Sequence, residues 1–262
     1  MTRGPTLLGN WLFILGEGNI KKRIDTLLVN KGLVPTRSRA RSLIMSGDVF
    51  VDGARVDKAG TLVEKNSKVE LRNPPQKYVG RGGIKLESAL REFNIEVRDK
   101  VAFDVGASTG GFTDCLLKHG AKKVYAVDVG YGQLDWKLRQ DPRVIVMERI
   151  NARYLKPEDI GELVDVSTID VSFISLTKII PPVSQILKPG GLLVALIKPQ
   201  FEVGKGEVER GGIVRDKGKH GEVTDKITRF LEELNFKILD IIPSPILGAG
   251  GNKEFLVVGI YG

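Results

Sequence analysis

Four charged residues of this chain stand where a reaction can be carried out. Lys85 opens a segment with helical spacing, and Asp170 and Lys198 each end an apolar run typical of a strand. Glu254 begins the last such run. A single charged residue at a strand end is most often solvated. Four of them, in the order Lys-Asp-Lys-Glu on separate elements, favour a catalytic set in which amines exchange a proton and carboxylates orient them.

A glycine-rich turn supplies a second candidate site. It follows an apolar run that ends at Val105, and it reads Gly-Ala-Ser-Thr-Gly-Gly from Gly106 to Gly111. Such a turn between a strand and a helix lets the backbone approach a ligand closely. The next apolar run leads to Asp128, 18 residues beyond Gly110. A carboxylate at this position can accept hydrogen bonds from both hydroxyls of a ribose.

A glycine-rich turn between a strand and a helix occurs in three kinds of site, which we compare with this sequence. A dinucleotide fold needs Gly-x-Gly-x-x-Gly, which is absent, and no lysine follows as in a phosphate-binding loop. Residues 106–110 match the Gly-x-Ser-x-Gly elbow of hydrolases, with His220 as a downstream base, but that interpretation gives Asp104 no role. Binding of S-adenosylmethionine uses both carboxylates, with Asp104 on the amino group of the methionine moiety and Asp128 on the ribose.

We therefore expect S-adenosylmethionine as the cofactor. Asn151 and Ala152, which follow the third predicted strand, would then lie near the adenine. The predicted cofactor-binding residues are Asp104, Gly106, Ser108, Thr109, Gly110, Gly111, Phe112, Thr113, Asp128, Val129, Asn151 and Ala152. We expect no metal, because a single cysteine and two histidines leave too few of the usual ligands.

These residues require a sheet whose strands end side by side. Between residues 81 and 262, apolar runs alternate with stretches of helical spacing. Strands are predicted at 101–105, 123–129, 144–148, 166–171, 192–198, 237–242 and 255–260, and helices at 84–93, 111–119, 176–187 and 217–234. This alternation predicts a Rossmann-like α/β fold. Its mostly parallel sheet carries helices on both faces, and ligands bind beyond the carboxyl ends of the strands.

A smaller basic domain of the α+β type is predicted at 20–72, followed by a linker at 73–80 that contains two prolines. Two helices, the second at 36–46 with Thr36 as its cap, precede a hairpin that turns at Asp52-Gly53. We expect the helices to pack on a small sheet. Basic side chains gather on and before the second helix and predict RNA binding through phosphate: Lys21, Lys22, Arg23, Arg37, Arg39 and Arg41.

Composition limits the class of protein. Of the 262 residues, 42% are hydrophobic, which excludes wholesale disorder. The formal net charge of +8 favours a polyanionic partner. The longest apolar runs fall short of the ~20 residues of a membrane-spanning helix, and the single cysteine fits a reducing cytoplasm. We expect residues 1–19 to form an arm outside the folded domains.

The sequence resembles two known domain types in tandem. The runs Arg-Ile-Asp-Thr-Leu-Leu-Val and Thr-Arg-Ser-Arg-Ala-Arg-Ser-Leu-Ile-Met-Ser-Gly-Asp-Val-Phe-Val-Asp-Gly resemble the S4-like RNA-binding domain. The order of the domains and the Lys-Asp-Lys-Glu set, over about 20–260, resemble the TlyA-like family, often labelled hemolysins, whose catalytic half is FtsJ-like. The resemblance implies 2′-O-methylation of cytidines in 16S and 23S ribosomal RNA, with Lys85, Asp170, Lys198 and Glu254 as the catalytic tetrad.

The chemistry of that reaction agrees with the tetrad. A ribose hydroxyl is a poor nucleophile and must lose its proton as the methyl group is transferred. An amine can take that proton only if burial or a nearby cation lowers its pKa. Lys198, at the end of a central strand, is the residue that we expect to take the proton.

Two other functions stay open at this point. A ribosome assembly factor with an inactive methyltransferase fold would bind RNA with the same domains but would have no use for the tetrad. A membrane-active hemolysin needs a long apolar span, an amphipathic insertion helix or barrel strands. Only residues 6–15 are remotely suitable, and they are too few to span a membrane.

Overall fold

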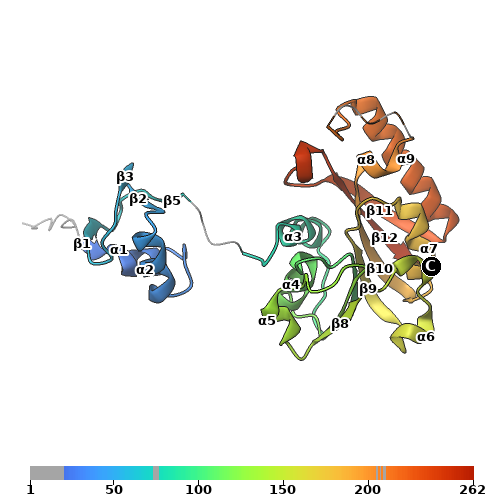
Figure 1. Cartoon of the computed structure of the whole chain (residues 1–262), viewed down its shortest axis with the longest axis horizontal. Helices are drawn as coiled ribbons and strands as arrows, with labels where there is room; N and C mark the ends of the chain where they lie inside the picture. The colour runs from blue at the N-terminus through green and yellow to red at the C-terminus, as the bar shows by residue number, and fades with distance from the viewer. Residues whose placement is uncertain (1–20, 73–76, 205, 207, 209–210) are drawn as a thin grey trace, which may run out of the picture. The chain divides into compact units, whose positions relative to one another are not determined.

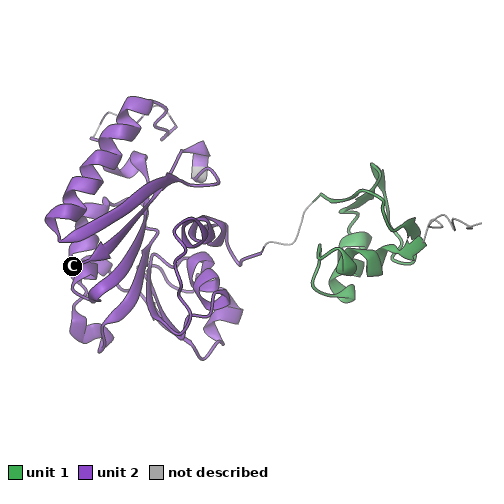
Figure 2. Cartoon of the chain, turned by 180° about the vertical axis from the view of Figure 1, so that it is seen from behind, with its two compact units in different colours: residues 1–75 green, residues 76–262 purple. Residues whose placement is uncertain are grey.

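The computed structural model contains two compact units, Met1–Pro75 and Gln76–Gly262 (Figure 2). The structure describes residues 21–72, 77–204, 206, 208 and 211–262. The predicted arm at 1–19 lies outside these residues, as do positions 73–76 of the predicted linker. Each unit has a hydrophobic core of its own.

The N-terminal unit contains the expected pair of helices, but its sheet is split in two. Its elements are β1 (Lys21–Arg23), α1 (Ile24–Asn30), α2 (Arg37–Met45), β2 (Val49–Val51), β3 (Ala54–Arg55), β4 (Leu62–Glu64) and β5 (Val69–Leu71). β1 pairs with β4, while β2 lies between β3 and β5. Leu28 of α1, Ile44 of α2 and Val49 of β2 are fully buried in one core, which joins the helices to the strands.

Local sequence signals explain how α2 begins and how the hairpin turns. The hydroxyl of Thr36 accepts a hydrogen bond from the backbone N–H of Arg39 (3.2 Å), so Thr36 caps α2 as predicted. Asp52 and Gly53 have φ of 49° and 82°, which is the conformation of a two-residue turn between paired strands.

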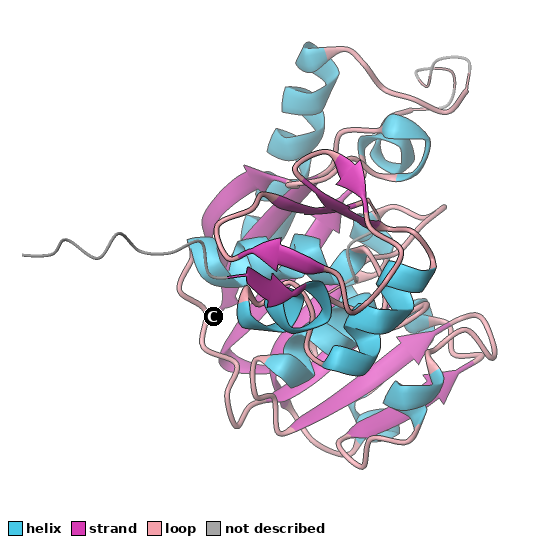
Figure 3. Cartoon of the chain, turned by 90° about the vertical axis from the view of Figure 1, so that its left-hand side faces the viewer, coloured by secondary structure: helices cyan, strands magenta, loops and turns pink. Residues whose placement is uncertain are grey.

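The C-terminal unit is a seven-stranded sheet with helices on both faces (Figure 1), and Figure 3 distinguishes helices from strands by colour. Its elements are α3 (Gly82–Glu92), β6 (Val101–Val105), α4 (Gly111–Lys118), β7 (Lys123–Asp128), α5 (Trp136–Arg139), β8 (Val144–Glu148), η1 (Ala152–Tyr154), α6 (Pro157–Ile160), β9 (Val164–Ile169), η2 (Leu176–Lys178), α7 (Ile180–Ser184), β10 (Leu187–Ile197), α8 (Pro199–Glu202), α9 (Lys217–Glu233), β11 (Phe236–Pro243), η3 (Ala249–Gly251) and β12 (Phe255–Tyr261). The strand order is β11-β12-β10-β9-β6-β7-β8. β12 runs antiparallel to β10 and β11, and the other neighbouring strands are parallel. The predicted mostly parallel α/β fold is confirmed.

Helices cover this sheet through two separate cores. Leu86 of α3 and Leu116 of α4 pack in one core, and Ile227 of α9 packs in the other. Along β6, Ala102 belongs to the first core and Phe103 to the second. Since side chains alternate between the faces of a strand, a strand buried on both faces is apolar at consecutive positions. This is why the central strands could be predicted as continuous apolar runs.

The predicted helix at 176–187 is wrong in extent. That stretch contains only η2 and the short α7, and β10 already begins at Leu187. Pro181 and Pro182 lie at the start of α7, and proline supplies no N–H for a hydrogen bond within a longer helix. The leucines and isoleucines of this stretch are buried and have helical spacing. The two prolines nevertheless prevent one continuous helix.

Candidate active site

The glycine turn after β6 lies directly against the residue that follows β9. A Cβ atom on Gly106 would come within 2.5 Å of the backbone oxygen of Asp170, and Gly106 has φ of +83°. Gly110, the residue before α4, has φ of +96°. Side chains are disfavoured in both conformations, and the missing Cβ of Gly106 lets the ends of β6 and β9 meet.

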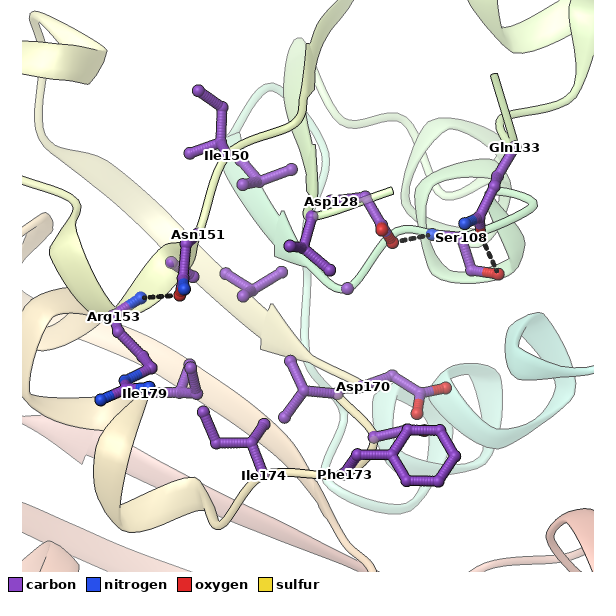
Figure 4. A pocket seen from close by; sticks show the side chains of 17 residues that line it. Ser108, Asp128, Gln133, Ile150, Asn151, Arg153, Asp170, Phe173, Ile174 and Ile179 are labelled. Carbon is purple, nitrogen blue, oxygen red and sulfur yellow. Dashed lines mark hydrogen bonds between the residues drawn. The ribbon is translucent and has the colours of Figure 1, made fainter. Parts of the chain in front are cut away.

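A cavity of about 420 Å³ opens beyond these strand ends (Figure 4). Asp128, the last residue of β7, lines it. One carboxylate oxygen of Asp128 accepts a hydrogen bond from the backbone N–H of Ser108 (2.8 Å), and the other accepts one from Gly130 (2.7 Å). Each oxygen can accept a further bond. Asp128 is therefore held in place and can still bind two hydroxyls.

Most predicted cofactor-binding residues line this cavity or the smaller one beside it. These residues are Gly106, Ser108, Thr109, Gly111, Phe112, Asp128, Val129, Asn151 and Ala152. Other lining residues were not predicted from the sequence, among them Gln133, Ile150, Arg153, Ser172, Phe173, Ile174 and Ile179. All of these follow β7, β8 or β9 in sequence, so their position after a predicted strand was the available signal.

Asp104, Gly110 and Thr113 line neither cavity. Asp104 is fully buried, and its two oxygens accept hydrogen bonds from the hydroxyls of Thr113 (2.6 Å) and Thr168 (2.8 Å). Burial raises the pKa of Asp104 to about 6, and the two hydroxyls oppose part of that rise. Asp104 links β6 to α4 and β9 beneath the turn. Its contact with the amino group of the methionine moiety stays a prediction.

A smaller cavity of about 200 Å³ shares Gly106, Ser108, Asp170 and Ser172 with the larger one. Lys198 lies in its wall, with Nζ 2.6 Å from Oδ1 of Asp170. The same amine donates a hydrogen bond to the hydroxyl of Ser172 (2.9 Å). The neighbouring parallel strands β9 and β10 thus bring two of the four predicted catalytic side chains together, and Ser172 is a third partner that the sequence analysis missed.

The other two members of the predicted tetrad form a separate ion pair. Nζ of Lys85 in α3 lies 2.5 Å from Oε2 of Glu254, which precedes β12. Both side chains are buried, and neither lines the two cavities. The tetrad therefore consists of two pairs. One lies in the wall of the small cavity, and the other joins α3 to the residue before β12.

Phe173 is the most exposed aromatic residue near the cavities. It is 90% exposed and lines the larger cavity, and its ring centroid lies 5.1 Å from that of Phe201. Its φ of +63° is unfavourable for a bulky residue, a kind of backbone strain that persists where the surroundings fix it and is concentrated at functional sites.

Glu202 joins the segment after β9 to the segment after β10. Its buried carboxylate accepts hydrogen bonds from the hydroxyl of Ser175 (2.6 Å) and the backbone N–H of Leu176 (2.7 Å). Burial raises the pKa of Glu202. Because Lys198 and Asp170 lie just ahead of the two joined segments, Glu202 restrains the spacing of the pair in the small cavity.

In the N-terminal unit, three of the six predicted RNA-binding residues converge on one carboxylate. Arg23, Arg37 and Arg41 all contact the buried Asp25. The remaining three are Lys21 and Lys22 in β1 and the exposed Arg39 in α2.

The large cavity is suited to the adenosine part of S-adenosylmethionine. Asp128 presents two acceptors that suit the ribose hydroxyls, and Asn151 and Ala152 line the same cavity. Among the described residues, no three His, Cys, Asp or Glu side chains are grouped so that they could hold a metal ion.

Comparisons with known proteins match both units. The model of the FtsJ-like methyltransferase family matches residues 78–261, and that of the S4 domain matches residues 22–69. A Mycobacterium tuberculosis protein named 16S/23S rRNA (cytidine-2′-O)-methyltransferase TlyA is 42% identical over 90% of this chain and 89% of its own. A Streptococcus thermophilus structure, provisionally called a hemolysin, is 46% identical with a TM-score of 0.71, covering 92% of this chain and 88% of that one.

A more distant structural match supports the fold alone. A Listeria monocytogenes structure, provisionally assigned as an S-adenosylmethionine-dependent methyltransferase, has a TM-score of 0.52 at 17% identity and covers 70% of this chain and 100% of that one. Within the described parts of the chain, no helix has both the length and the apolar character needed to cross a membrane.

Proposed function

This chain belongs to the FtsJ-like methyltransferases and carries an S4 domain ahead of the catalytic one, and we propose that it transfers a methyl group from S-adenosylmethionine to a ribose 2′-hydroxyl of ribosomal RNA. The mycobacterial relative is named for cytidines of 16S and 23S ribosomal RNA, and we propose the same targets here. Ribosomal RNA as substrate implies that the protein acts in the cytoplasm.

The arrangement of the two cavities is the observation that carries this proposal. The cavity suited to adenosine and the polar cavity of the Asp170–Lys198 pair share Gly106, Ser108 and Asp170. A cofactor that extends from one cavity into the other would bring its reactive end to a buried amine and a carboxylate. This is the arrangement that methyl transfer to a hydroxyl requires, because the acceptor must be positioned and deprotonated at the same place.

We propose that Asp128 binds the ribose hydroxyls of the cofactor, while Asn151 and Ala152 contact the adenine. When bound, S-adenosylmethionine supplies an electrophilic methyl group on a sulfonium. The glycine turn at 106–111 allows the backbone to approach the cofactor closely, and Gly82 leaves room beside the ring of Phe112, because a Cβ there would lie 3.1 Å from that ring. The protein contributes position and exclusion of water at this point.

Lys198 is the group that we propose takes the proton of the 2′-hydroxyl. Its neutral amine donates its two N–H groups to Asp170 and Ser172, so that the nitrogen lone pair remains to accept the proton of the substrate hydroxyl. Asp170 orients the amine and stabilises the positive charge that the proton brings. Lys85 and Glu254 line neither cavity, and we propose that they support α3, whose first turn contains Gly82 of the small cavity.

Mapping of 2′-O-methylation tests the function directly. Ribosomal RNA from a strain that lacks the gene is incubated with the protein and S-adenosylmethionine, and ribose methylation is mapped at single-nucleotide resolution. We expect new 2′-O-methyl groups on cytidines. Binding of RNA and cofactor without any methylated ribose would instead identify an assembly factor with an inactive methyltransferase fold, and methylation on a base would contradict the assigned acceptor.

A further inference from the structure

Three guanidinium groups of the N-terminal unit converge on one carboxylate. Asp25 lies in the first turn of α1 and is fully buried. Arg23 binds it with a fork, Nε to Oδ1 at 3.1 Å and Nη2 to Oδ2 at 3.0 Å. Arg37 donates to Oδ2 at 2.9 Å, and Nε of Arg41 lies 3.5 Å from the same oxygen.

The sequence places these groups together for simple geometric reasons. Arg23 and Asp25 flank the start of α1. Arg37 and Arg41 are four residues apart on α2 and therefore share one face of that helix, whereas Arg39 does not belong to that face. The α1–α2 packing brings this face to the start of α1.

The charge of Asp25 is maintained in this position. The hydrogen bond from Arg23, together with Arg37, holds the pKa of Asp25 well below its usual range, although burial acts in the opposite direction. The cluster of one carboxylate and three guanidinium groups therefore keeps a net charge of about +2 across the neutral pH range.

The arginines keep most of their hydrogen-bonding capacity. Their side chains are 46%, 52% and 56% exposed for Arg23, Arg37 and Arg41. The fork of Arg23 gives two donors to Asp25, and Arg37 gives one. Within the part of the chain that the structure describes, the other N–H groups of each guanidinium remain for an external acceptor, and the planar guanidinium fork matches the oxygens of a phosphate.

We propose that Asp25 is a positioning residue, which holds Arg23, Arg37 and Arg41 as one preformed phosphate-binding site for RNA. The proposal rests on the proposed function, since that function supplies RNA as the ligand. Three positive side chains without a counter-charge repel one another and sample many rotamers. Asp25 offsets the repulsion and fixes the rotamers in advance, so that less entropy is lost when a phosphodiester binds.

A positioning role of Asp25 and a simple effect of net charge predict opposite changes in the affinity for RNA when Asp25 is lost. If charge alone decided affinity, loss of the negative Asp25 would strengthen binding to RNA. If Asp25 positions the arginines, the same loss weakens it. We therefore compare Asp25→Asn with Asp57→Asn in the full chain. Asp57 is an exposed carboxylate of the same unit, so both variants gain the same charge.

Affinity for a ribosomal RNA fragment is measured over a series of salt concentrations. We expect Asp25→Asn to bind roughly tenfold more weakly, on the scale of one charge-assisted hydrogen-bonding group. The slope of log K against log salt should fall by about 0.7–0.9 for each phosphate that the arginines no longer neutralise. Asp57→Asn should bind at least as tightly as the wild type. Equal or tighter binding by Asp25→Asn, in a folded protein, overturns the proposal.

A second pair of variants tests the proposal if Asp25→Asn does not fold. Arg23→Lys removes the fork on Asp25 but keeps the charge, and Arg39→Lys makes the same exchange outside the cluster. We expect the first to weaken RNA binding several-fold more than the second, and equal effects contradict the proposal. Wild-type protein that fails to bind ribosomal RNA at all would contradict the proposed function instead.

Discussion

Lys85 and Glu254 lie 169 residues apart in sequence, and their side chains form a buried ion pair with 2.5 Å between Nζ and Oε2. The pair connects α3 to the residue before β12. Removing two charges from water is costly, and a buried pair is stable only while both partners are present. The pair thus makes the position of α3 depend on the segment that leads into β12.

Breaking this pair should destabilise the catalytic unit. We expect Glu254→Gln to lower the free energy of unfolding by about 3–5 kcal/mol, because Lys85 then becomes an uncompensated buried charge. The double variant Lys85→Met with Glu254→Leu should lose clearly less than the sum of the single variants Lys85→Met and Glu254→Leu. Urea denaturation followed by fluorescence measures these variants beside Glu254→Gln and the wild type. Strictly additive losses would show that the two side chains are not coupled.

Lys198 carries the sharpest prediction about the reaction. Lys198→Ala should leave cofactor binding nearly unchanged and lower the methylation rate by at least the ~10²-fold that is typical of a lost general base. Lys198→Arg should fail as well, since a guanidinium keeps the charge but does not release its proton at usable pH. Single-turnover methylation of ribosomal RNA gives the rates. A near-normal rate for Lys198→Arg would reduce the role of this residue to positioning or charge stabilisation.

Asp128 should determine affinity for the cofactor. Asp128→Ala removes both acceptors proposed for the ribose and should weaken binding of S-adenosylmethionine by roughly 1–3 kcal/mol. Calorimetric titration measures the loss, with thermal unfolding of the unliganded variant as a control for the contacts to Ser108 and Gly130. Unchanged affinity would mean that the ribose is held elsewhere.

Asp104 should make stability fall as the pH rises. The folded protein keeps a proton on Asp104 up to a pKa of about 6, whereas an unfolded chain loses it near ~4. Between these values the folded state binds more protons, so raising the pH through this window lowers the free energy of unfolding, by roughly 3 kcal/mol in total.

The variant Asp104→Asn isolates that contribution. Asparagine cannot titrate, so the unfolding free energy of the variant should rise relative to that of the wild type between pH 4 and pH 7, by about 2 kcal/mol. Denaturation curves at several pH values measure this difference. A difference that does not change with pH would show that Asp104 has the same pKa in the folded and the unfolded chain.

Glu202 should affect turnover and not cofactor affinity. Glu202→Ala frees Ser175 and Leu176, and with them the spacing between Asp170 and Lys198. We expect kcat to fall by roughly tenfold, on the scale of a misplaced reacting group, while the KM for S-adenosylmethionine stays the same. Glu202→Gln can still bind the N–H of Leu176 and should restore part of kcat. Equal kcat in the two variants would speak against the positioning role.

The sequence predicted those parts of the molecule that depend on local patterns. Ala102 and Phe103 face opposite cores, so β6 had to be apolar at consecutive positions, and the glycine turn after it marked the site. Contacts between distant segments could not be predicted in the same way. Asp104 was predicted to bind the cofactor because it precedes the turn, but its hydrogen bond from Thr168, on another strand, had no signal in the local pattern.

Which residues of the tetrad pair with each other could not be predicted from the sequence for the same reason. Four charged residues at element ends gave no indication that Lys198 pairs with Asp170 while Lys85 pairs with Glu254. That choice follows from the strand order, which puts β9 beside β10 and β12 on the other side of β10. Asp25 was missed because a carboxylate between basic residues looks like an ordinary exposed charge until the packing of α1 is known.

The place of β12 in the sheet has a consequence for the order of folding. β12 pairs with both β10 and β11, although it follows every other strand of the sheet in sequence. Until it docks, β10 has an open edge and Lys85 has no counter-charge. Contacts across such long separations form slowly, because loop closure must precede the gain from pairing. During synthesis the chain therefore carries the whole N-terminal unit, which precedes every strand of the large sheet, before β12 can cover the edge of β10.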